Sequence, residues 1–148
     1  MNESPGRIVV GVDGSDASLD AIRWALRQAQ LSNSTVEAVT SWEYPSQMAE
    51  FVADDIDWEA CARSILDDAL TTVDADGDVA IVRTTTHGHP AQVLCDASTD
   101  ADLLVVGSRG HGGFVGMMLG SVSVHVSAHA DCPVVVVRHH NVLSTATR

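Results

Sequence analysis

A glycine-rich stretch between Asp102 and Ser123 carries the residue types and spacing best suited to chemistry. It follows a short apolar run, and glycine recurs in it at Gly107, Gly110, Gly112, Gly113, Gly116 and Gly120. Backbone N–H groups in such a loop can surround a phosphate, and a helix that begins near Gly120 adds the positive end of its dipole. The hydroxyl groups of Ser121 and Ser123 can donate further hydrogen bonds. The stretch predicts an anion site, with an ordinary surface loop as the alternative.

Two familiar phosphate-binding motifs are excluded by the residues present. The chain contains no lysine, so the P-loop lysine that reaches the β- and γ-phosphates is missing. The dinucleotide fingerprint G-x-G-x-x-G fails because Val115 stands where its third glycine belongs. Phosphoryl transfer also needs concentrated positive charge and a positioned base, and neither stands beside this loop. We therefore expect no catalytic residue here.

The charge balance disfavours polyanionic partners. The net charge is −12, with 20 acidic residues against 8 arginines, so nucleic acid and anionic membrane surfaces are repelled. The segment 107–130 is different, because it has no acidic residue and contains Arg109 and His111. No apolar run reaches the roughly 18 residues of a membrane helix, and no signal-type segment opens the chain, so we expect a cytoplasmic protein. The three cysteines are expected to be reduced and buried.

The elements that would position the loop alternate between strands and helices. Apolar, β-branched runs predict strands at Arg7–Val12, Val36–Trp42, Val79–Thr86, Leu103–Val106 and Pro133–Arg138. Apolar residues at helical spacing predict helices over Leu19–Ala29, Trp58–Val73 and Pro90–Ala97. This alternation predicts an α/β domain with a parallel sheet and helices on both faces.

A longer pattern covers most of the chain. Gly107, Gly110, Gly120 and Ser121 have the spacing glycine, two residues, glycine, nine residues, glycine, serine. This spacing resembles the ATP-binding branch of the universal stress protein family. The opening RIVVGVDGSDAS is similar to the first strand and turn of that family, and CPVVVVR is similar to its last strand. The resemblance extends from about Arg7 to Arg138.

The resemblance implies a fold as well as a family. It implies a Rossmann-like (HUP-type) five-stranded parallel sheet in the order 3-2-1-4-5, which makes the first and fourth strands neighbours. We expect one domain over 1–148, with its core at about 7–138 and a polar tail at 139–148. The segment Ser121–Ala130 alternates polar and apolar residues, which by itself predicts a strand, but the family has a helix here, and we expect the helix.

The resemblance also implies a site for ATP, or a related adenine nucleotide, bound with Mg²⁺. Asp13, with the neighbouring Gly11 and Val12, and the backbone at Ser41 match the positions on the adenosine side. The phosphate side would be formed by Val106, Gly107, Arg109, Gly110, Gly120, Ser121, Val122 and Ser123. The family commonly forms homodimers, here through the edge strand Pro133–Arg138. The implied role is that of a regulatory, stress-response module.

Two other functions stay open. The chain could be a slow ATPase or another nucleotide-dependent enzyme, or a dimeric interaction module with an empty pocket. Two histidine pairs, His87 with His89 and His125 with His129, invite a metal hypothesis. No further ligand is suitably spaced near the first pair, and surface histidines are common. We therefore expect no protein metal site.

Overall fold

A computed structural model describes residues 4–44, 56–73, 75, 77–110 and 119–139 of the chain. Strands and helices alternate along it, with the bounds β1 (Arg7–Gly11), α1 (Asp16–Ser32), β2 (Thr35–Trp42), α2 (Trp58–Thr72), β3 (Ile81–His87), α3 (Pro90–Ala97), β4 (Leu103–Gly107), α4 (Ser121–His129) and β5 (Val134–Val137). The predicted alternation is confirmed, and so is the helix at 121–129 where the local pattern alone favours a strand.

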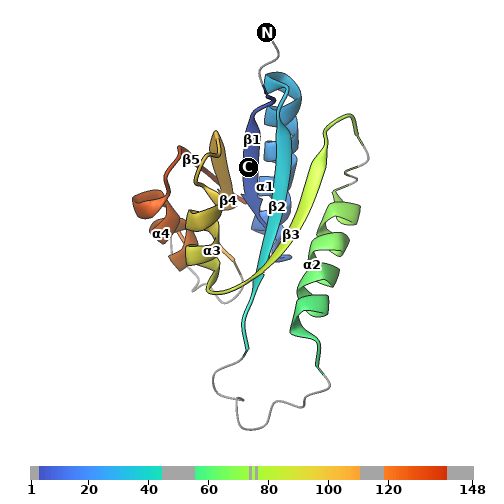
Figure 1. Ribbon diagram of the computed structural model, residues 1–148, viewed down its shortest axis with the longest axis vertical. Helices are drawn as coiled ribbons and strands as arrows, with labels where there is room; N and C mark the ends of the chain where they lie inside the picture. Colours follow the sequence, from blue (N-terminus) through green and yellow to red (C-terminus); the bar gives the residue numbers. More distant parts are fainter. Residues whose placement is uncertain (1–3, 45–55, 74, 76, 111–118, 140–148) are drawn as a thin grey trace, which may run out of the picture.

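The strands form one parallel sheet in the order β3-β2-β1-β4-β5 (Figure 1). This order confirms the expected fold, in which the first and fourth strands are neighbours. Their register pairs Ile8 with Leu103 and Val10 with Val105. Because the strands are parallel, their carboxyl ends meet at one edge of the sheet, which is where open α/β sheets bind ligands.

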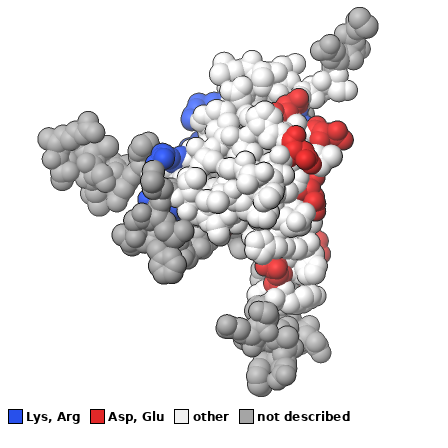
Figure 2. Space-filling view, turned by 90° about the vertical axis from the view of Figure 1, so that its left-hand side faces the viewer, with Lys and Arg blue, Asp and Glu red and all other residues white. Residues whose placement is uncertain are grey.

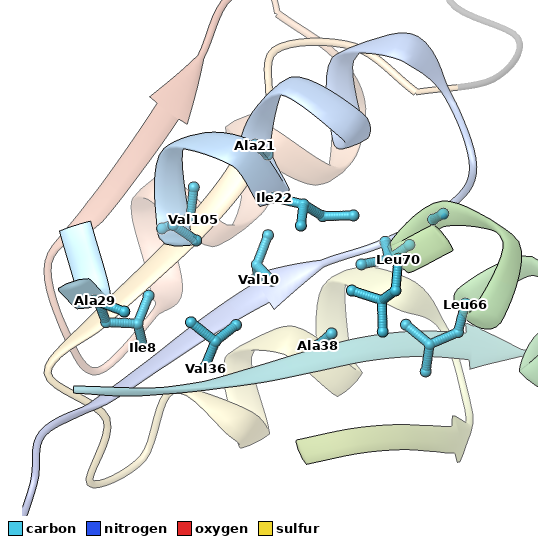
Figure 3. Close-up of a cluster of buried hydrophobic side chains, with 13 residues drawn as sticks. Ile8, Val10, Ala21, Ile22, Ala29, Val36, Ala38, Leu66, Leu70 and Val105 are labelled. Atoms are coloured by element: carbon cyan, nitrogen blue, oxygen red, sulfur yellow. The ribbon is translucent and has the colours of Figure 1, made fainter. Parts of the chain in front are cut away.

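Helices cover both faces of the sheet, and successive side chains along each strand point to opposite faces. One face packs against α1 and α2 through side chains that Figure 3 shows converging on a common core, among them Ile22, Leu66 and Leu70. These three side chains are at most 1% exposed. The other face packs against α3 and α4, where Leu94 and Val126 meet the remaining strand side chains. The two cores fix the strand ends relative to each other.

Several predicted boundaries shift by one to two residues. β1 ends at Gly11 rather than Val12, and β5 is confined to Val134–Val137. β3 begins at Ile81 rather than Val79, although the Ala80 carbonyl already accepts the N–H of Val36. The predicted edge position of this strand is confirmed.

The expectation that all three cysteines are buried is wrong for one of them. Cys95 is buried and Cys132 is half-buried, but Cys61 is exposed on α2. Cys61 is turned away from the sheet because the inner face of this helix is formed by Ala62, Leu66, Ala69 and Leu70. Burial raises the pKa of Cys95, and the nearby carboxylates of Asp96 and Asp131 raise it further. Its thiol therefore stays protonated at neutral pH.

Arg7 joins the first strand to two other elements. Its guanidinium contacts the Glu37 carboxylate at 2.5 Å on β2 and donates to the carbonyls of Ala97 and Thr99 at 3.0 and 2.7 Å. These carbonyls lie at the end of α3 and just beyond it, where helical carbonyls lack intrahelical partners. Glu37 also accepts a hydrogen bond from Thr84 on β3. One polar network therefore connects three adjacent strands and caps a helix.

A second polar contact holds the segment after β5. The Nδ1 atom of His139 lies 2.7 Å from a carboxylate oxygen of Asp20 on α1, and Arg23 donates to the other oxygen. Burial raises the pKa of Asp20, but the hydrogen bonds and charges of His139 and Arg23 outweigh burial and lower the pKa overall. The carboxylate thus contributes stability above its unfolded-state pKa, and this contribution is lost as the pH falls through the folded-state pKa.

Within the described ranges, no helix is long and apolar enough to cross a membrane.

Candidate functional site

The candidate site lies at the carboxyl ends of the two central strands. Asp13 stands two residues beyond the end of β1, and Ser108, Arg109 and Gly110 follow the end of β4. The structure brings these segments together, although Asp13 and Ser108 are 95 positions apart in a sequence of 148 residues. Most of the predicted site residues therefore gather at one edge of the sheet.

Gly110 and Asp13 are in direct contact. A Cβ atom built on Gly110 would overlap the Oδ2 atom of the Asp13 carboxylate, so only glycine allows this approach. The other carboxylate oxygen accepts hydrogen bonds from the Ser15 N–H at 2.9 Å and from the Ser15 hydroxyl at 2.5 Å. Gly14, which lies between Asp13 and Ser15, has a φ of 82°, a conformation that favours glycine. The turn before α1 thus presents Asp13 to the loop after β4.

The backbone around Val12 is held by the neighbouring strand. Its N–H donates to the Val39 carbonyl at 2.8 Å, and its carbonyl accepts from the buried Thr40 hydroxyl at 2.9 Å. Gly11, which ends β1, has no Cβ and lies against Leu94 and Val106. These contacts hold the backbone just before Asp13 in place at the end of β1.

Gly107, predicted to lie against a phosphate, lies against the backbone of Ala17 in this structure. A Cβ at this position would lie 2.7 to 2.8 Å from the backbone carbon and oxygen and the Cβ of Ala17 in the first turn of α1. Real Cβ atoms do not approach so closely. In this structure, Gly107 therefore lets α1 pack directly on the end of β4.

The start of α4 rests on the loop that follows β4. Gly120 is the N-cap residue, and its N–H donates to the Ser108 carbonyl at 2.6 Å. A Cβ on Gly120 would be 3.4 Å from the Cα of Arg109 and 3.6 Å from the N atom of Gly110. No side chain caps this helix within the described residues. The first N–H groups of an α-helix lack intrahelical acceptors, so this end is a suitable place for an anion.

The two predicted serines differ in where their hydroxyl groups can act. Ser121 is exposed at the start of α4. Ser123 is 2% exposed, and its hydroxyl donates to the Gly120 carbonyl at 2.9 Å and lies 3.3 Å from the Ser108 carbonyl. Val122 is half-buried and packs against the core below α3 and α4. Ser123 thus connects α4 to the loop, while Ser121 faces outward.

Sequence reasoning did not place His87 beside Trp42 and Tyr44, and the structure gathers these three rings at the ends of β2 and β3. Trp42 lies opposite His87 in the strand register, with ring centroids 4.6 Å apart, and Tyr44 is 5.6 Å from Trp42 and 5.7 Å from His87. Ser41, the predicted adenosine-side residue, precedes Trp42 and pairs with Thr86. Trp42 and His87 come together because of the register between β2 and β3, and this register cannot be read from the sequence.

Charged side chains are distributed unevenly over the molecule. Figure 2 shows acidic side chains along one edge of the molecule and most of the visible basic side chains on the opposite side. Arg109, two residues beyond the end of β4, is exposed. His111, Gly112, Gly113 and Gly116, which the sequence analysis included in the loop, lie outside the described residues.

The sheet order is that of the class of α/β proteins in which ligands bind where the strand order reverses, and in this chain Asp13 meets the loop after β4 at that point. The sequence profile of the Universal stress protein family matches residues 5–138. The chain belongs to this family.

Comparisons with individual proteins agree with the family. Universal stress protein Rv2623 of Mycobacterium tuberculosis H37Rv is 38% identical over 135 residues, which cover 88% of this chain and 44% of that protein. Rv2624c of the same organism is 35% identical over 133 residues, covering 88% and 47%. The chain thus spans less than half the length of these curated relatives.

Solved structures share the fold. Universal stress protein UspA from Lactobacillus plantarum superposes with a TM-score of 0.76 at 23% identity, covering 93% of this chain and all of that one. A universal stress protein crystallised in complex with cAMP has a TM-score of 0.69 at 31% identity, with the same coverage of both chains.

Proposed function

We propose that this protein binds an adenine nucleotide, ATP with Mg²⁺, between the carboxyl ends of β1 and β4, and acts as a regulatory stress-response module in the cytoplasm rather than as an enzyme. The observation that carries the proposal is the contact between Asp13 and Gly110. It unites the two predicted halves of the site at the sheet edge where such folds bind ligands. The complex of a 31% identical universal stress protein with cAMP supports the same class of ligand.

The phosphate half of the proposed site uses main-chain donors. The start of α4 has no side-chain cap within the described residues and lies against the backbone at Ser108, Arg109 and Gly110. The N–H groups of Ser121 and Val122 and the helix dipole suit phosphate oxygens. Arg109 supplies a positive charge, and Ser121 supplies an exposed hydroxyl. In this arrangement Ser123 supports the site by holding α4 in place rather than by binding phosphate.

The adenosine half is assigned to the β1 and β2 side. A phosphate in direct contact with the Asp13 carboxylate would be repelled, so Asp13 is better suited to accept hydrogen bonds from ribose hydroxyls or to face Mg²⁺. The backbone of Gly11, Val12 and Ser41 lies at the carboxyl ends of β1 and β2, on the same side of the proposed site as Asp13. Mg²⁺ would enter with the phosphates, because this cation keeps most of its water ligands.

Calorimetric titration with ATP tests the proposal. We expect one ATP per chain and tighter binding with Mg²⁺ than without it, and mass spectrometry of denatured protein should detect the released nucleotide. Parallel titrations with AMP and cAMP identify the preferred ligand. If none of the three binds at millimolar concentration, the proposal is wrong and an interaction module without a ligand remains. If bound ATP is recovered as ADP, the protein is a slow ATPase instead.

We propose further that two copies pair through β5. This strand ends the sheet, and the carbonyls of Pro133 and Val137 accept hydrogen bonds from the N–H groups of Leu104 in β4 and of Ser108, the residue after β4. In a parallel strand, alternate residues direct their backbone groups to opposite sides. Val134 and Val136 therefore direct theirs away from β4. An apolar edge of this kind readily pairs with another strand. The β5 strand of a second copy would supply hydrogen-bond partners for these outward backbone groups.

Replacing Val136 by proline tests the dimer. Proline removes the outward N–H without affecting a β4 hydrogen bond, and it is tolerated on edge strands. Sedimentation velocity should give a dimer for the wild-type chain and a monomer for Val136→Pro, with unchanged far-UV circular dichroism. A wild-type monomer, or a variant that dimerises as tightly as the wild type, would contradict the proposal.

A further inference from the structure

Two histidines lie side by side on the outer face of α4. His125 and His129 are one helical turn apart and both are exposed, whereas the inner face of the helix is anchored by the buried Ser123 and Val126. Their ring centroids are 4.5 Å apart and the ring planes are inclined by 44°. Two imidazoles thus share a small volume at the protein surface.

We propose that His125 and His129 form a binding site for a divalent transition-metal cation of the imidazole-preferring type. A metal–nitrogen bond of about 2.1 Å and a nitrogen about 1.1 Å from its ring centre place each centroid about 3.2 Å from the metal. Two ligands in adjacent positions, about 90° apart as in tetragonal coordination, then have centroids about 4.5 Å apart. The observed centroid separation of 4.5 Å allows this arrangement.

The helix is what creates the pair. Four residues of α-helix advance about 6 Å and return to the same face, whereas four residues of strand advance about 13 Å. The alternating pattern of Ser121–Ala130 left both structures open from local sequence alone, and the expectation of ordinary surface histidines did not consider how closely the rings approach.

Coordination would be completed by water. Within the described residues, no group of three or more histidine, cysteine, aspartate or glutamate side chains could hold a metal. Counting only ligands from the part of the chain that the structure describes, the site is bidentate and open. Imidazole ligands favour Cu²⁺ over Ni²⁺ and Ni²⁺ over Co²⁺, and they do not suit Mg²⁺. This site is thus distinct from the Mg²⁺ proposed to accompany ATP, and the inference does not depend on nucleotide binding.

The other histidine pair provides a matched control. The Nδ1 atom of His89 accepts the N–H of Ala91 at 3.2 Å as the N-cap of α3. The ring of His87 contacts Trp42 and Tyr44. Both side chains are therefore engaged in local structure, and we assign them no metal.

Titration of the full chain, prepared without a histidine tag, with NiCl₂ tests the site. We expect one Ni²⁺ per chain, binding at least about tenfold weaker in His125→Gln and in His129→Gln, and unchanged binding in His89→Gln. CuCl₂ should bind more tightly than NiCl₂, and MgCl₂ should not compete.

Line broadening of the histidine ring signals by Ni²⁺ in the wild-type chain gives a second measurement that needs no variant. The signals of His125 and His129 should broaden first. Wild-type affinity in either glutamine variant, broadening that begins at other histidines, or no Ni²⁺ binding at millimolar concentration would each overturn the proposal.

Discussion

The variant Gly110→Val is expected to bind ATP at least about a hundredfold more weakly than the wild type, a loss of about 2.7 kcal/mol. The first side-chain atom at this position would overlap the Asp13 carboxylate. The Asp13 carboxylate, which Ser15 holds in place, must turn away from the loop after β4, so the group proposed to face the ribose or Mg²⁺ is displaced. Gly110 is exposed and contributes no side chain to a core, so the free energy of unfolding should change little. Calorimetric titration with Mg²⁺-ATP measures the effect.

The matched control for this variant is Gly77→Val. A Cβ at Gly77 meets no atom within 4 Å, so the same substitution there adds the same side chain in open space. It should bind ATP like the wild type. If Gly110→Val also binds normally while remaining folded, the contact between Gly110 and Asp13 does not form part of a nucleotide site, and the proposed function loses its main support.

The variant Gly107→Ala is expected to lower the free energy of unfolding by about 1–3 kcal/mol, toward the upper end of that range. The added methyl group would lie 2.7 to 2.8 Å from main-chain atoms of Ala17, which cannot rotate away as a side chain can. Relief requires α1 to shift away from β4, and α1 also covers the main core. Urea denaturation followed by circular dichroism measures the loss.

Gly11→Ala distinguishes this packing role from a general intolerance of side chains at strand ends. Its Cβ would lie 2.8 Å from a terminal methyl group of Leu94, a side chain that can change rotamer. We expect a smaller loss of stability than for Gly107→Ala. An equal or larger loss in Gly11→Ala would show that the approach of α1 to β4 is not the critical contact. ATP affinity per folded Gly107→Ala molecule should fall less than in Gly110→Val.

The sequence predicts most of the architecture because its signals are local. The apolar run before Gly107 and the β-branched run after Arg7 identify the central strands, and both are confirmed. The strand order came from the family resemblance, since periodicity alone does not state which strands are neighbours. Once that order is given, the convergence of Asp13 with the glycine-rich loop follows from the common direction of the strands.

The roles of individual site residues could not be predicted, because they depend on tertiary contacts. Gly107 and Gly110 belong to the same motif, yet one lies against the backbone of α1 and the other against Asp13. Ser121 and Ser123 are two residues apart, and the rotation of a helix turns one outward and the other into the protein. The spacing of a motif does not distinguish these environments.

The central position of β1 has a consequence for how the chain folds during synthesis. β1 is made first, but one of its two neighbours is β4, whose residues Leu103 to Val105 are made much later. Until then one side of β1 has no partner, and contacts so distant in sequence form slowly. A nascent chain that ends before Leu103 presents an open apolar strand edge, which is prone to aggregation. The same sheet order that assembles the candidate site thus delays its completion until β4 and α4 have left the ribosome.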